Sequence, residues 1–131
     1  MPTPILTLTP AQIAKLNAMP QSYSAVVTTV GAASDTVALG TFPVGETDWL
    51  RLTVDGHDGA EAAGWNINWL WLNDAGVMTS ISNPATGAPR STAALATATL
   101  VLQDDGAGGI EAVITGVLGQ TIEWHLFWHF E

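Results

Sequence analysis

Two segments of the chain carry bulky apolar side chains at every second position, which is the period of a β-strand and not of a helix. The segments are residues 65–72 and 121–130, and their aromatic faces consist of Trp65, Ile67, Trp69 and Trp71 and of Ile122, Trp124, Leu126, Trp128 and Phe130. Large aromatic rings stabilise a fold most when they are removed from water. We therefore expect two central strands whose indoles supply much of the core, namely Trp65, Trp69, Trp71, Trp124 and Trp128.

The remainder of the chain after residue 21 consists of further strand-like segments separated by turn signals. Strands are predicted at residues 22–30, 36–39, 48–54, 65–72, 77–81, 92–103, 110–115 and 121–130. Clusters rich in Gly, Asn and Asp lie between them, for example at residues 55–59 and 104–109. Short connections favour antiparallel neighbours, because parallel strands need long crossovers. The sequence thus predicts an all-β fold, an antiparallel β-sandwich or small jelly-roll-like barrel of about eight strands, in a single domain over residues 21–131.

The first 20 residues differ from this β body and are predicted to form an arm with a short helix. Thr9, Pro10 and Gln12 have the form of a helix start with proline at the first helical position. Ile13 and Leu16 then form an apolar pair on one helical face. Since two side chains are too few to bury themselves, we expect this helix to dock on another surface.

The sequence of residues 92–103 is compatible with either a helix or a strand. Four alanines favour a helix, whereas Thr97, Thr99 and Val101 favour a strand. We predict a strand, with a face of small side chains that allows a second sheet or subunit to approach closely.

The charge of the chain excludes several classes of partner. Three cations, Lys15, Arg51 and Arg90, oppose 12 carboxylates, and the formal net charge is -9. Binding to nucleic acid or to an anionic membrane needs clustered Lys and Arg, so neither partner is expected. No apolar run approaches the roughly 20 residues of a membrane-spanning helix. Charged residues make up only 11% of the chain, and such a weakly charged surface packs readily against neighbouring proteins.

No pattern for catalysis or for a cofactor stands out. The chain lacks cysteine, and none of its three histidines lies near a Gly-x-Ser-x-Gly elbow. Glu123 and His125 are close enough on one strand face to share a metal ion, but His129 lies about 13 Å beyond His125 on an extended chain. A polar strand face that contacts solvent or a subunit is the preferred reading for His125 and His129. The Asp-Gly clusters lack the spacing of a twelve-residue calcium loop. We expect no enzyme activity and no cofactor.

One aromatic residue is predicted to lie outside the core. In residues 48–54, Leu50, Leu52 and Val54 share a face, so Trp49 and Arg51 project from the opposite face. An exposed indole can stack on a sugar ring or fill a pocket of a protein partner. Packing of Trp49 under a loop, the N-terminal helix or a neighbouring subunit is the competing interpretation.

Over its whole length the chain resembles the small accessory structural proteins of tailed-phage virions, of the head decoration, head fibre or tail type. The resemblance lies in a proline-led arm and short helix over residues 3–20, followed by a β body rich in Thr, Ala and Gly. It implies a non-enzymatic virion protein, assembled in the host cytoplasm, that forms homo-oligomers and binds other capsid or tail proteins. The alternative is a carbohydrate- or receptor-binding β-sandwich module that uses exposed aromatics, with a glycan as partner. The expected contact residues are Ile13, Leu16, Trp49, Arg51, His125 and His129.

Overall fold

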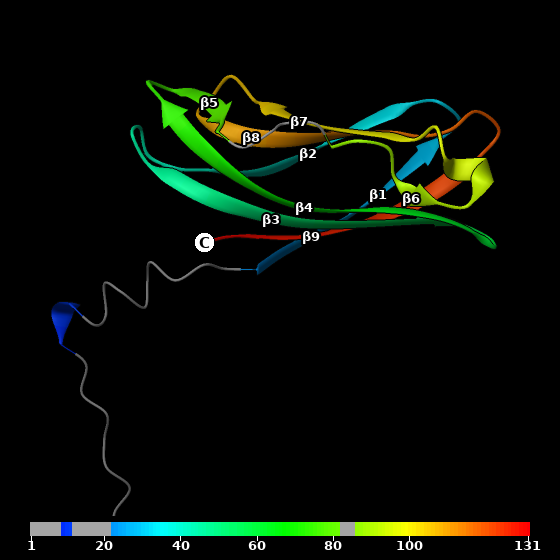
Figure 1. Cartoon of the computed structure of the whole chain (residues 1–131), viewed down its shortest axis with the longest axis horizontal. Helices are drawn as coiled ribbons and strands as arrows, with labels where there is room; N and C mark the ends of the chain where they lie inside the picture. Colours follow the sequence, from blue (N-terminus) through cyan, green and yellow to red (C-terminus); the bar gives the residue numbers. More distant parts are fainter. Residues whose placement is uncertain (1–8, 12–21, 82–85) are drawn as a thin grey trace, which may run out of the picture.

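The computed structural model describes residues 9–11, 22–81 and 86–131. The strands between Ser22 and Phe130 form two facing antiparallel sheets (Figure 1). The strands are β1 (Ser22–Val30), β2 (Ser34–Thr41), β3 (Thr47–Asp58), β4 (Glu61–Asp74), β5 (Val77–Ser80), β6 (Arg90–Ser91), β7 (Thr99–Asp104), β8 (Gly109–Thr115) and β9 (Thr121–Phe130). One short 3-10 helix, η1 (Ala93–Leu95), precedes β7. No helix among these residues is long and apolar enough to cross a membrane.

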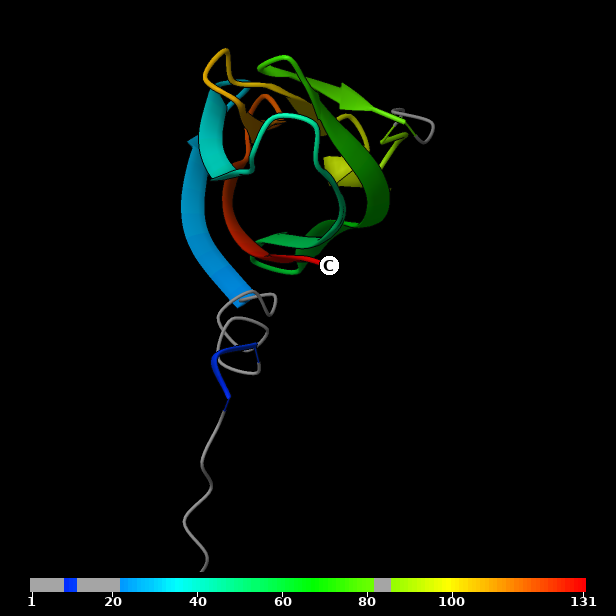
Figure 2. The ribbon, with the colours of Figure 1, turned by 90° about the vertical axis from the view of Figure 1, so that its left-hand side faces the viewer.

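The larger sheet has the strand order β1-β9-β3-β4-β5, and β6 also pairs with β4. The smaller sheet has the order β2-β8-β7. Figure 2 views the two sheets end-on, with β1 at the margin of the molecule. The prediction of an all-β fold of antiparallel strands is confirmed. The barrel alternative is wrong, because the strands of the described residues remain in two separate sheets. Nine strands replace the expected eight, since the two-residue strand β6 is too short to give a sequence signal.

The core lies between the sheets and contains the side chains that the strand alternation predicts. Leu50, Leu52 and Val54 of β3 face inward, as does every second residue of β4 and β9. The five tryptophans expected in the core are all at most 8% exposed, and Trp124 is fully buried. Removing one indole from water contributes about 4–6 kcal/mol before the entropy of ordering the side chain. These rings therefore dominate the favourable energy of packing the two sheets.

Three of the buried indoles also satisfy their N–H groups, and one of these bonds joins the sheets. Trp128 of β9 donates to the carbonyl oxygen of Leu39 in β2 at 2.7 Å. Trp124 donates to Oγ1 of Thr29 in β1 at 2.9 Å, and Trp65 donates to the Gly87 carbonyl at 3.3 Å. Among the described residues, the buried Nε1 of Trp71 has no hydrogen-bond partner.

The prediction of one strand over residues 92–103 is wrong in its first half. The alanine-rich part forms η1, and β7 begins only at Thr99. In β7 the inward residues are even-numbered, Leu100 and Leu102, whereas Leu95 is odd-numbered and fully buried. A continuous strand would point Leu95 toward solvent, so the helical turn changes the phase and buries it. The outward face of β7 therefore carries Thr99 and Val101, and the expected face of small side chains is not formed.

The turn expected at residues 55–59 begins later than predicted. β3 continues to Asp58, and the hairpin to β4 turns at Gly59 and Ala60, with a φ of +58° at Gly59. Gly56 serves packing and not the turn. A Cβ atom built on it would lie 2.2 Å from Cε3 of Trp124, so the absent side chain is what makes room for the indole.

The predicted N-terminal arm and helix fall mainly outside the described residues, which include only 9–11 of that region. Ile13 and Leu16 belong to the part that is not described. Residues 9–11 are exposed, and although Pro10 and Ala11 have helical backbone, two residues do not make a helix, so the structure gives the predicted helix no support.

Candidate functional site

The outer face of the larger sheet, which points away from the smaller sheet, is the candidate site. Its side chains are those that alternate with the core residues of β1, β9, β3 and β4. Strand register arranges them in rows across the sheet: His129, Arg51 and Asn68 form one row, and Phe127, Thr53 and Asn66 form the next. The core side chains of these strands point the other way, so the side chains of the outer face are not needed to fill the core.

Large apolar side chains are exposed on the outer face. Phe127 is 51% exposed, Val26 is 59% exposed and Trp49 is 41% exposed. Arg51 follows Trp49 at the next outward position of β3 and precedes Thr53, the cross-strand partner of Phe127. The two aromatic rings thus flank a guanidinium group on one continuous surface. Monomeric proteins usually cover such side chains, and gathered exposed ones mark contact sites.

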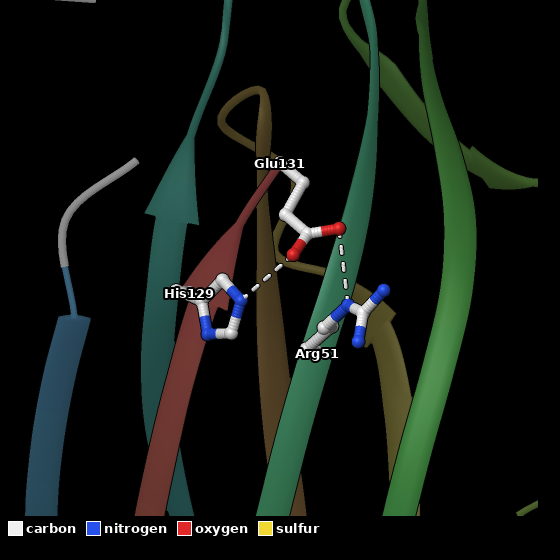
Figure 3. A network of polar contacts seen from close by, with 3 residues as sticks. All are labelled: Arg51, His129 and Glu131. Atoms are coloured by element: carbon white, nitrogen blue, oxygen red, sulfur yellow. Dashed lines mark hydrogen bonds and ion pairs between the residues drawn. The ribbon is translucent and has the colours of Figure 1, made fainter. Parts of the chain in front are cut away.

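A polar network lies between these aromatic residues (Figure 3). Nε of Arg51 is 3.0 Å from Oε2 of Glu131, and Nε2 of His129 is 3.2 Å from Oε1 of the same carboxylate. Backbone bonds in both directions between Trp49 and Glu131 hold the carboxylate in place. The hydrogen bond from His129, together with Arg51, lowers the pKa of the Glu131 carboxyl. The carboxylate therefore stays ionised and orients the side chains of Arg51 and His129.

The second histidine pair lies further along the same face. Nε2 of His125 is 2.7 Å from Oε1 of Glu123, and its ring stacks on His57 with centroids 5.9 Å apart. All three histidines of the chain thus project from the outer face of β3 and β9. Among residues 9–11, 22–81 and 86–131, no three His, Cys, Asp or Glu side chains are grouped to hold a metal ion. The side chains of Glu123 and His125 form a hydrogen bond on this surface.

The Asp-Gly cluster at residues 104–109 also uses its carboxylate within the turn. Oδ1 of Asp105 accepts hydrogen bonds from the backbone N–H groups of Ala107 and Gly109 at 2.7 and 3.0 Å. This is the ordinary way in which aspartate stabilises a tight turn.

A groove of about 830 Å³ opens near the start of β4. Asp55 of β3, Gly64 of β4 and Arg90 of β6 are cross-strand neighbours in a single row. Gly64 has no side chain, so the floor of the groove is low between a carboxylate and a guanidinium group. Asn66 and Thr86 also line it. The groove presents a carboxylate and a guanidinium group, and the mostly buried indole of Trp65 also lines it.

The structure places four of the predicted contact residues on this one face: Trp49, Arg51, His125 and His129. Ile13 and Leu16 lie outside the described residues. Phe127 and Val26 were not among the predicted contacts, although the alternation in residues 121–130 already puts Phe127 on the same face as His125. The groove has no signal in the sequence, because Asp55, Gly64 and Arg90 meet only through strand pairing.

Comparisons of this chain with protein-family models, with curated proteins and with solved structures find no match. The outer face of the larger sheet is therefore the feature from which a function can be inferred.

Proposed function

We propose that this protein is a non-enzymatic structural component of a phage-like virion, a decoration, fibre or tail accessory protein that acts through protein-protein contacts. The observation that carries the proposal is the outer face of the larger sheet, where the exposed rings of Trp49 and Phe127 flank Arg51. Tryptophan and arginine are the residues most enriched among the side chains that dominate the energy of protein interfaces. The partners in this role are further copies of the chain and other capsid or tail proteins.

Electrostatics support a protein partner for this face. Arg51 is paired with Glu131, so its charge is already balanced before a partner binds. A partner that covers the pair would meet an oriented, largely neutral surface. The carboxylate excess of the whole chain, with a formal net charge of -9, favours partners whose facing surface is neutral or basic.

Cosedimentation with purified capsids and tails tests this proposal. The test variant combines Trp49→Ala with Phe127→Ser. A matched control, Val101→Ser, changes a 48%-exposed residue on the outward side of the smaller sheet. Loss of a central aromatic contact costs about 2 kcal/mol or more, so the double variant is expected to bind at least about 30-fold more weakly. The control is expected to bind as the wild type does. Absence of any binding, or equal binding by all three proteins, would overturn the proposal.

The exposed indole also favours one alternative, a carbohydrate- or receptor-binding module. Trp49 is 41% exposed and stands beside Arg51, an arrangement in which a sugar ring can stack on the indole while the guanidinium donates to its hydroxyl groups. A glycan array with the wild type and with Trp49→Ala separates the two functions. Binding that disappears in the variant supports the alternative, and no binding by either protein removes it.

A further inference from the structure

The edges of the two sheets differ in how well they are protected against pairing with another chain. An edge strand has backbone N–H and C=O groups on one side that no neighbouring strand uses. Natural proteins protect such edges with short strands, charges, prolines or bulges. Within the described residues, the edge strands are β1, β5 and β6 of the larger sheet and β2 and β7 of the smaller sheet.

Four of these edges carry a protective feature. β5 has four residues and β6 has two, and β6 contains Arg90. β2 contains Asp35 and a register shift between Ala38 and Gly40. β7 has six residues and ends in Asp104. Each of these features limits the pairing of a further strand.

β1 carries none of them. Its nine residues include no charge, no proline and no glycine, and they are rich in valine and threonine, which favour strands. All nine residues pair with β9 in unbroken register, so the strand contains no bulge. β1 lies at the margin of the molecule in Figure 2. The middle residue of the strand, Val26, is 59% exposed.

We propose that β1 pairs with β1 of a second copy, antiparallel and centred on Val26, so that two six-stranded sheets become one continuous sheet. The partner named here is a second copy of the chain. The biological purpose of this pairing rests on the proposed function in assembly, but the pairing itself does not. The two-fold axis runs perpendicular to the sheet, so both outer faces lie on the same side.

The sequence of β1 suits pairing with itself in this register. On the outer face Val26 meets Val26 of the second copy, and Ser24 meets Thr28. Apolar β-branched pairs and hydroxyl pairs are both favourable across antiparallel strands. No position places like charges opposite each other. This matters in a chain with a formal net charge of -9, because the overall negative charge opposes self-association.

Pairing with a strand of a different protein would not require β1 to be complementary to itself. The self-complementary register and the absence of charge from this edge favour a second copy over an unrelated acidic or basic strand. Pairing of β1 with another segment of the same chain would instead leave the wild type monomeric, which sedimentation equilibrium detects.

Single cysteines test the register, because the chain has no cysteine of its own. In the full-length Val26→Cys variant, the two Cβ atoms would lie about 4.5–5.5 Å apart, close to the spacing of a disulfide. Mild oxidation is expected to give a covalent dimer. The control Thr28→Cys would place its two cysteines about 14 Å apart, four residues along the strand, too far for a disulfide. A mixture of Ser24→Cys with Thr28→Cys is expected to cross-link.

Sedimentation equilibrium tests the edge itself. Val26→Glu places a carboxylate directly opposite its copy and is expected to weaken dimerisation at least tenfold. The control Val44→Glu adds the same charge at a residue that is 66% exposed outside the strands and is expected to change dimerisation little. Circular dichroism checks that both variants fold.

Three results would overturn the inference: a wild type that stays monomeric at high concentration, cross-linking by Thr28→Cys as readily as by Val26→Cys, or a dimer that Val26→Glu leaves intact. None of these measurements involves a virion. The Trp49→Ala and Phe127→Ser variant keeps β1 intact, so it is expected to dimerise normally even where it fails to bind capsids or tails. Failure of the pairing and failure of the proposed function are therefore distinguishable.

Discussion

The packing of Trp124 on Gly56 gives the sharpest prediction for stability. Replacing Gly56 by alanine adds one methyl group at a position where Cβ would lie 2.2 Å from Cε3 and 2.4 Å from Cζ3 of the indole. The ring has little room to move, because Trp124 is fully buried, packs against Trp65 in a tilted arrangement with centroids 5.6 Å apart and donates to Thr29. The methyl group must therefore displace a ring that contacts three strands.

The expected size of the effect follows from three contributions. Overpacking of a core costs about 1–3 kcal/mol. Distortion of the buried hydrogen bond from Trp124 to Thr29 adds about 1 kcal/mol. Against this, alanine restricts the unfolded chain more than glycine does, which returns about 0.4–1 kcal/mol. The free energy of unfolding should fall by about 2 kcal/mol.

Urea unfolding followed by tryptophan fluorescence measures this change. With a slope of about 1–3 kcal/mol per molar for a domain of this size, the midpoint should fall by about 1 M. Trp124→Phe removes the part of the ring that the new methyl group meets. In the double variant the two effects should therefore be clearly less than additive. A Gly56→Ala protein with an unchanged or higher midpoint, or strictly additive effects, would refute the proposed packing.

Two further predictions concern other buried and exposed groups. In the same urea assay, Trp124→Phe should lower the free energy of unfolding by about 1–2 kcal/mol more than Trp71→Phe does. Trp124→Phe leaves the buried Thr29 hydroxyl without its hydrogen-bond donor, whereas the N–H of Trp71 has no partner to lose. Equal losses in the two variants would contradict this. The pKa of Glu131 is lowered in the fold, chiefly by His129, so its contribution to stability is present above the ordinary pKa of 4.5 and is lost as the pH falls through the lower folded value. Glu131→Gln should accordingly flatten the acid side of the stability curve measured from pH 6 to pH 2 by denaturant titrations, and an unchanged slope would contradict the ion-pair network.

The strand alternation predicted most of the fold because burial repeats with the same period. Trp69 and Trp128 lie on inward faces for the reason that the sequence indicates, namely that a large ring on a half-polar strand is stable only inside. The turn residues likewise mark most strand ends. What the pattern lacks is the identity of each strand's neighbours, so the choice between two sheets and a closed barrel stayed open.

The errors have particular physical causes. Leu95 is buried by a change of phase that alanine content alone does not reveal. Gly56 resembles a turn residue in the sequence, but in the structure its missing side chain makes room for the indole of Trp124. That indole belongs to β9, which begins 65 residues later, at Thr121. The composition of the outer face was partly predictable, since alternation places Trp49 and Arg51 on it. The network with Glu131 and the groove at Asp55 depend on register between distant strands, which local sequence does not encode.

Hydroxyl-radical footprinting of the side chains, in the isolated protein and in its assembled form, tests the central claim most directly. In the isolated protein Trp49 should be oxidised fastest of the six indoles, since it is 41% exposed and the others are at most 8% exposed. On assembly Trp49 and Phe127 should become protected while Val101 on the smaller sheet stays reactive. Rapid oxidation of the core indoles, or protection of Val101 with Trp49 unchanged, would contradict the assignment of the outer face as the contact surface.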